Sequence, residues 1–109
     1  MNKFIRIIFL NILVIPLLFL NLATASEKLK IGLLVPMSGS NKDLGQSIIK
    51  AVRLAIKDID NDLIEVIPKD TASTPNKTLQ SALELKDLGV KIVIGPIFHN
   101  NLVYLEEVI

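Results

Sequence analysis

The chain has 109 residues, of which 12 are lysine or arginine and 11 are aspartate or glutamate, and it contains no cysteine. The absence of cysteine excludes both a disulfide framework and a thiolate metal site. A formal net charge of only +1 excludes the strong basic footprint of nucleic-acid-binding proteins, so no nucleic-acid partner is expected.

The N-terminal segment has the pattern of a secretory signal peptide. A basic start is followed by an almost wholly apolar run over residues 7–22 and by small residues at the two positions that a signal peptidase reads. The alternative is an uncleaved membrane anchor, but the run is shorter than the roughly 20 apolar residues of a membrane span. Asn11 and Pro16 also interrupt it. We therefore expect cleavage after Ala25, a periplasmic location and no membrane span in the mature chain.

The first predicted strand covers residues 29–35. Its leucine, isoleucine and valine residues are continuous, which is typical of a strand covered on both faces in a parallel sheet. A polar loop follows, and Asp43 is expected to cap a helix over residues 44–59. The apolar face of this helix repeats at helical spacing and comprises Ile48, Val52, Ala55, Ile56 and Ile59.

The second strand is predicted over residues 63–67 and is expected to end at Pro68. Thr74 and Pro75 indicate the N-cap and first turn of a second helix, because proline is tolerated at the first helical position. Gly89 suits the left-handed residue that commonly ends a helix. The residues that this helix is expected to bury are Leu79, Ala82, Leu83 and Leu88.

The third strand is predicted over residues 91–94, and Gly95 and Pro96 close it. Asn100 or Asn101 is expected to cap a last helix. The resulting β-α-β-α-β-α order predicts an α/β fold with an open parallel sheet and right-handed crossovers.

Ligands in open parallel sheets bind outside the carboxyl ends of the strands. The loops that follow the three strands are 36–43, 69–74 and 95–101. Their polar residue types are also common in caps and turns, so it is their clustering at one edge that indicates a binding site. The polar loop residues are Ser38, Ser40, Asp70, Thr71, Ser73, His99 and Asn100.

No catalytic or metal-binding motif is complete. His99 is the only histidine, and the G-x-S-x-G turn that would present a catalytic serine is missing. In an acidic run that resembles a calcium loop, Leu63 stands where glycine is required and Lys69 where glutamate is required. Gly39 and Gly45 have the wrong spacing for a phosphate-binding loop. We expect no enzymatic activity, no metal and no cofactor.

Two segments resemble a known family. Residues 31–39 (Ile-Gly-Leu-Leu-Val-Pro-Met-Ser-Gly), with Leu44 and Gly45 opening a helix, resemble the start of the periplasmic binding proteins of the leucine/isoleucine/valine type. Residues 90–96 (Val-Lys-Ile-Val-Ile-Gly-Pro) resemble the third strand of that family. The resemblance implies a type I periplasmic binding protein, in which two lobes clamp a solute. Residues 26–109 would then be part of the N-terminal lobe of a longer protein.

The resemblance implies the substrate-binding component of an ABC transporter for amino acids of the branched-chain type or similar small polar solutes. Its partners would be the solute and the membrane permease of the transporter. Loops 36–43 and 95–101 would form half of the ligand cleft. The expected ligand-binding residues are Ser38, Gly39, Ser40, His99, Asn100 and Asn101.

A subgroup of the same fold provides an alternative. Residues 70–75 and 94–101 look more like the penicillin-binding protein activators, which bind and stimulate a peptidoglycan synthase without doing chemistry themselves. Leu44 stands where amino-acid binders often carry an aromatic residue, and residues 99–101 replace the serine or threonine hydroxyls that hold a carboxylate. The enterobacterial activators are lipoproteins, however, and this chain lacks the necessary cysteine. Both functions remain open at this point.

Overall fold

The structure is a computed structural model that describes residues 2–3 and 26–108. The expected cleavage site after Ala25 lies outside the described residues, and so does the apolar run before it. Within the described part of the chain, no helix has the length and apolarity needed to cross a bilayer.

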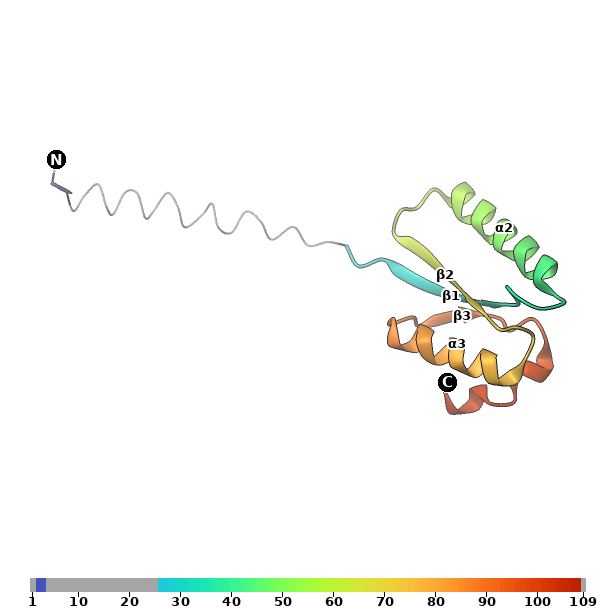
Figure 1. Cartoon of the computed structure of the whole chain (residues 1–109). Coiled ribbons are helices and arrows are strands. Elements are labelled where there is room, and N and C mark those ends of the chain that lie inside the picture. Colours follow the sequence, from blue (N-terminus) through green and yellow to red (C-terminus); the bar gives the residue numbers. More distant parts are fainter. Residues whose placement is uncertain (1, 4–25, 109) are drawn as a thin grey trace.

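A three-stranded parallel sheet forms the centre of the fold (Figure 1). Strand β1 (Leu29–Val35) lies between β2 (Ile64–Asp70) and β3 (Ile92–Ile94). β1 pairs with β2 along its whole length, ending with Val35 opposite Asp70, and with the shorter β3 over three residues. The predicted α/β fold with an open parallel sheet is therefore confirmed. Because the strands are parallel, the loops that follow them lie at one edge of the sheet.

Two helices, α2 (Lys42–Ile59) and α3 (Pro75–Asp87), cover opposite faces of this sheet (Figure 1). Successive side chains of a strand point to opposite faces. Leu33 and Val35 accordingly pack with Ile49 of α2, whereas Leu34 packs with Leu85 of α3. Burial on both faces explains why β1 is continuously apolar.

The buried face of α2 is displaced from the predicted one. Gly45 and Ile49 are buried, and the predicted residues Ile48, Val52 and Ile56 are half-buried. The other two predicted members of this face are exposed, Ala55 and Ile59. The stripe is centred on Gly45 because the missing side chain lets the first turn approach the end of β1.

The prediction for the buried face of α3 was wrong at two positions. Leu83 and Leu88 are each 44% exposed. The sheet-facing stripe is instead Thr78, Ser81, Ala82 and Leu85. The two hydroxyls can be buried because each donates a hydrogen bond to a backbone carbonyl. The Thr78 hydroxyl donates to the Thr74 carbonyl, and the Ser81 hydroxyl donates to the Asp70 carbonyl. A count of apolar residues alone does not detect such positions.

The second strand is longer than predicted, since β2 continues through Pro68 to Asp70. Proline is tolerated there because β2 is at the edge of the described sheet. An edge strand has a neighbour on one side only, so a residue without an N–H need not remove a hydrogen bond between strands. The second helix begins as predicted: Thr74 accepts a hydrogen bond from the Lys77 N–H, and Pro75 is the first helical residue.

Three further boundaries were placed differently by the sequence. Asp43 is not the N-cap of α2 but lies in its first turn, and the capping position is Asn41. The expected last helix is replaced by two short 3₁₀ turns, η1 (His99–Leu102) and η2 (Leu105–Glu107). Neither asparagine caps η1, which begins after Phe98. Asparagine and β-branched valine are weak helix formers, which favours such turns over a regular helix.

Candidate functional site

The loops after β1 and β2 are joined by the carboxylate of Asp70. Its Oδ1 accepts hydrogen bonds from the backbone N–H groups of Met37 (2.7 Å), Ser38 (3.2 Å) and Ala72 (2.8 Å). Its Oδ2 accepts a hydrogen bond of 2.6 Å from the hydroxyl of Ser38. We call these four residues the Asp70 clasp. Three of its four hydrogen bonds come from the β1 loop, so the carboxylate ties that loop to the end of β2.

The pKa of Asp70 is lowered from its ordinary value of 3.8. Burial acts in the opposite direction and raises the pKa, because it disfavours the charged form. The hydrogen bonds from the Ser38 hydroxyl and from the backbone N–H groups of Ala72, Met37 and Ser38 together outweigh burial and lower the pKa. Asp70 is therefore ionised at neutral pH, and its hydrogen bonds are of the stronger, charge-assisted kind.

Further hydrogen bonds fix the β2 loop. The buried Thr71 donates its N–H to the Val35 carbonyl (2.9 Å), and the Asn41 side-chain amide donates to the Ser73 hydroxyl (3.1 Å). Ala72 and Ser73 have positive φ angles of 45° and 57°. Residues other than glycine adopt this left-handed conformation uncommonly, and here the hydrogen bonds to Asp70, Thr71 and Asn41 hold it. The edge of the sheet is therefore an ordered surface built from two loops.

The third loop is held against β1 by Gly95. Its φ angle is +107°, and a Cβ added there would lie 3.2 Å from the Cβ of Leu34 and closer still to the Leu34 carbonyl oxygen. Only glycine permits this approach. The following turn, η1, packs against α3. The third loop thus starts beside the first and continues toward the α3 face.

The structure brings the predicted ligand-binding residues to the carboxyl edge in two groups. Ser38, Gly39 and Ser40 are exposed on the β1 loop, and His99 and Asn100 are exposed on η1. Asn101 differs from these five. Its side chain is 2% exposed, and its Nδ2 has no hydrogen-bond partner among the described residues. Binding by any of the six remains a prediction.

Sequence reasoning missed the part that Asp70 plays in this edge. Asp70 was recognised as a polar loop residue but was not included among the ligand-binding candidates. The available signal was an acid at the end of a strand, followed by Thr71 and Ser73, which are typical of a tight turn. Nothing local in the sequence indicates that the donors come from residues 32 and 33 positions earlier.

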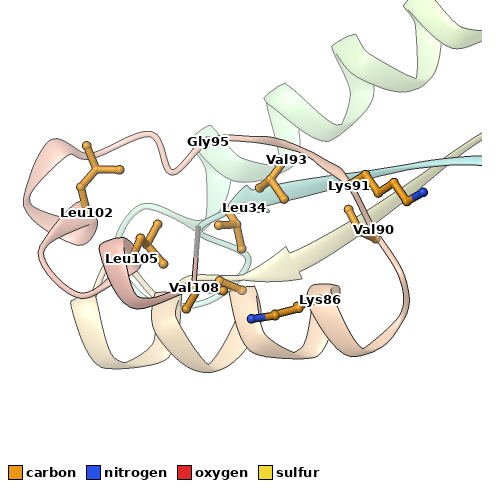
Figure 2. Close-up of a pocket in the computed structure, with 10 residues that line it drawn as sticks. Leu34, Lys86, Val90, Lys91, Val93, Gly95, Leu102, Leu105 and Val108 are labelled. Atoms are coloured by element: carbon orange, nitrogen blue, oxygen red, sulfur yellow. The ribbon is translucent and has the colours of Figure 1, made fainter.

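An apolar pocket of about 460 Å³ lies on the α3 side of the sheet, between β3, α3 and η2 (Figure 2). Leucine, valine and alanine side chains line most of it, together with Lys86, Lys91 and Gly95. It includes none of the six predicted ligand-binding residues. Within the described residues, no group of three or more histidine, aspartate or glutamate side chains is placed to hold a metal ion.

Comparison with known proteins identifies the family. The family model described as "Periplasmic binding protein" matches residues 28–108. The chain belongs to the periplasmic binding protein family. Among solved structures, an ABC transporter substrate-binding protein from Sphaerobacter thermophilus is similar, with a TM-score of 0.68 and 21% sequence identity. The match covers 75% of this chain and 24% of that chain.

The chain therefore spans about a quarter of the length of the Sphaerobacter protein. No curated protein sequence matches it. The resemblance found in residues 31–39 and 90–96 is confirmed at the level of the family and the fold. Membership in a family of periplasmic binding proteins implies a periplasmic location.

Proposed function

We propose that this chain is the ligand-recognition part of a periplasmic solute-binding protein, with an amino acid of the branched-chain type or a similar small polar molecule as its ligand. Residues 26–109 form part of the N-terminal lobe, after cleavage of a signal peptide at Ala25. The protein acts by binding, without catalysis, and delivers the solute to the membrane permease of an ABC transporter.

One observation carries this proposal. In a chain of this family, the exposed polar groups of Ser38, Gly39, Ser40, His99 and Asn100 lie at the carboxyl edge of the parallel sheet. That edge is where open α/β sheets bind their ligands. The edge is also ordered by the Asp70 clasp, so binding would not require the β1 loop to be rearranged first.

The chemistry of this edge suits a carboxylate. The Ser40 hydroxyl, the Asn100 amide and the N–H groups of Gly39 and Ser40 are hydrogen-bond donors. Helix α2 begins just after the β1 loop, and its N-cap Asn41 makes no side-chain hydrogen bond to the first turn. The first turn of a helix has N–H groups without intrahelical partners and the positive end of the helix dipole, both of which favour an anion.

One observation favours the alternative function, a penicillin-binding protein activator that docks on a peptidoglycan synthase. Two of the six predicted ligand-binding groups are already committed to the fold. The Ser38 hydroxyl donates to Asp70, and Asn101 is buried. A docking protein of the same fold does not need these groups for a small ligand.

Calorimetry on the purified chain separates the two functions. We expect heat of binding with at least one of L-leucine, L-isoleucine and L-valine, with an affinity near the millimolar range, about −4 kcal/mol, because one lobe encloses only part of a ligand. Replacing Ser40 or Asn100 by alanine should cost about 1–3 kcal/mol if the side chain bonds a buried ligand group. The matched control is Ser47→Ala, which removes an exposed hydroxyl that bonds only within α2.

The opposite result is equally clear. If no amino acid produces heat and the chain co-purifies with a peptidoglycan synthase, the solute-binding function is wrong and the activator function takes its place. If the Ser40 and Asn100 variants bind as the Ser47 control does, these residues do not belong to the site.

A further inference from the structure

We propose that Asp70 is a positioning residue for ligand binding: its carboxylate holds the β1 loop in the conformation that exposes Gly39 and Ser40, without itself contacting the ligand. The inference rests on the proposed solute-binding function. It concerns a residue that is absent from the predicted ligand-binding set.

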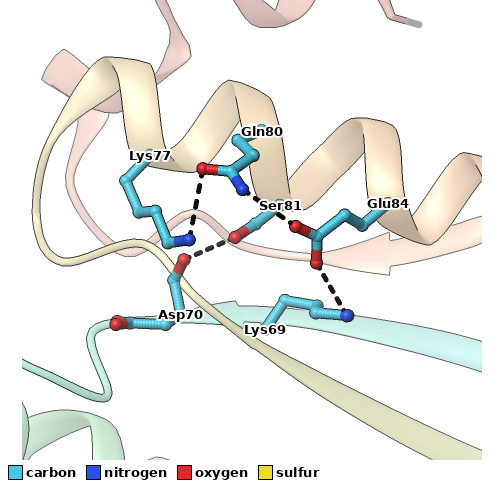
Figure 3. Close-up of polar contacts among 6 residues, drawn as sticks. All are labelled: Lys69, Asp70, Lys77, Gln80, Ser81 and Glu84. Carbon is cyan, nitrogen blue, oxygen red and sulfur yellow. Dashed lines mark hydrogen bonds and ion pairs between the residues drawn. The ribbon is translucent and has the colours of Figure 1, made fainter.

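Asp70 is well placed to hold a loop because two neighbouring elements fix its backbone. As the last residue of β2, it pairs with Val35 at the end of β1. On the other side, the hydroxyl of the buried Ser81 in α3 donates to the Asp70 backbone carbonyl (Figure 3). The backbone of Asp70 is thus anchored to β1 and α3. Its side chain is left to bond the two loops.

The β1 loop depends on this side chain for its order. Its first residue, Pro36, has no N–H to donate. Gly39 has a φ angle of +79°, but glycine adopts positive and negative φ angles about equally, so it does not itself fix the loop in this conformation. Between them, Met37 and Ser38 follow β1 and precede α2, and Asp70 is the partner that the structure gives to both N–H groups. Removing the carboxylate would leave these two donors to water and free the loop.

The carboxylate also suits this role better than an amide would. Oδ1 accepts three N–H groups, and Oδ2 accepts the hydroxyl of Ser38. A carboxylate offers acceptors at both positions, whereas asparagine has one acceptor and one donor. Asp70→Asn can keep the bonds to Oδ1 and must reverse or lose the bond to Ser38. Asp70→Ala loses all four bonds. Asp70→Asn therefore weakens the hydrogen bonding of the β1 loop in part, and Asp70→Ala removes it.

Solvent exchange of backbone amides, measured by NMR on the isotope-labelled chain, tests the proposal. In Asp70→Ala we expect the amides of Met37 and Ser38 to exchange at least about tenfold faster, because a tenfold change corresponds to about 1.4 kcal/mol, which is within the range of one hydrogen bond. Amides inside β1, such as that of Leu33, should be unchanged. Affinity for L-leucine, used as the probe, should fall by at least about tenfold as well. Asp70→Asn should give smaller changes in the same direction.

Two controls separate positioning from general destabilisation. Asp62→Ala removes an exposed acid in the loop before β2 and should change neither measurement. Ser81→Ala removes the hydroxyl that bonds the Asp70 carbonyl and should lower stability. Its Met37 and Ser38 amides should nevertheless exchange at the wild-type rate.

The outcomes are distinguishable. Unchanged exchange of Met37 and Ser38 in both Asp70 variants would overturn the positioning role, whether or not the chain binds L-leucine. Faster exchange combined with full L-leucine affinity would also overturn it, because the loop would then not matter for binding. Faster exchange in a chain whose wild type binds no amino acid would support the clasp and overturn the proposed function.

Discussion

Gly45 provides the sharpest structural prediction, because it determines how closely α2 approaches the end of β1. Gly45 is buried in the first turns of the helix. A Cβ added there would lie 2.6 Å from the carbonyl carbon of Pro36 and closer still to its oxygen, whereas real Cβ atoms essentially never approach another atom within 3.0 Å. The conflict is with backbone, so no change of rotamer can relieve it.

The sign of the effect of Gly45→Ala on stability tests this contact. Helix propensity alone would make alanine more stabilising than glycine by about 1 kcal/mol. Overpacking costs about 1–3 kcal/mol, and a clash with backbone belongs at or above the upper end. The net expectation is a destabilisation of about 2 kcal/mol, which lowers the melting temperature by about 8–16 °C in a domain of this size.

Thermal and urea denaturation followed by circular dichroism measure this effect. The control is Gln46→Ala, the exposed neighbour in the same helix, which should change the free energy of unfolding by no more than about 0.5 kcal/mol. If Gly45→Ala is instead more stable than the wild type by about 1 kcal/mol, the first turn of α2 does not approach Pro36 as described.

Two further predictions concern the core and the Asp70 clasp. Leu85 is fully buried between α3 and the sheet, so Leu85→Ala should lower the free energy of unfolding by about 2–5 kcal/mol. The control is Leu54→Ala, which should be nearly neutral because Leu54 is 60% exposed. Equal effects of the two substitutions in urea denaturation would contradict the assignment of Leu85 to the core. Because the pKa of Asp70 is lowered in the folded chain, its stabilising contribution is complete above the ordinary value of 3.8 and is lost as the pH falls through the folded pKa. The free energy of unfolding of the wild type should therefore fall more steeply below about pH 4 than that of Asp70→Asn, as measured by urea denaturation from pH 3 to pH 7. If the free energies of the two proteins change with pH in the same way, the carboxylate is not held as described.

The sequence predicts most reliably where local pattern and burial agree. The unbroken apolar run of β1 indicated a strand covered on both faces, and Leu33 and Leu34 do pack on opposite sides. The same reasoning failed for α3, where Thr78 and Ser81 occupy the buried face because backbone carbonyls accept their hydroxyls. It also ended β2 at Pro68, although proline is tolerated in an edge strand such as β2.

The candidate site was predictable in its location but not in its hydrogen bonding. The order of elements alone indicated that polar loops gather at the carboxyl ends of the strands. Which groups remain free depends on partners far apart in the chain. Ser38 bonds a carboxylate 32 positions away, and Asn101 is buried by packing of η1 on α3. No local pattern encodes either contact.

The most direct test of the central claim is a map of amide chemical shifts while the isotope-labelled chain is titrated with L-leucine, L-isoleucine and L-valine. The account predicts that at least one of these ligands shifts the amides of residues 37–43 and 97–101, and that amides at the opposite end of the sheet do not move. Shifts confined to the apolar pocket around Val93 and Leu105, or no shifts in a folded chain, would contradict it.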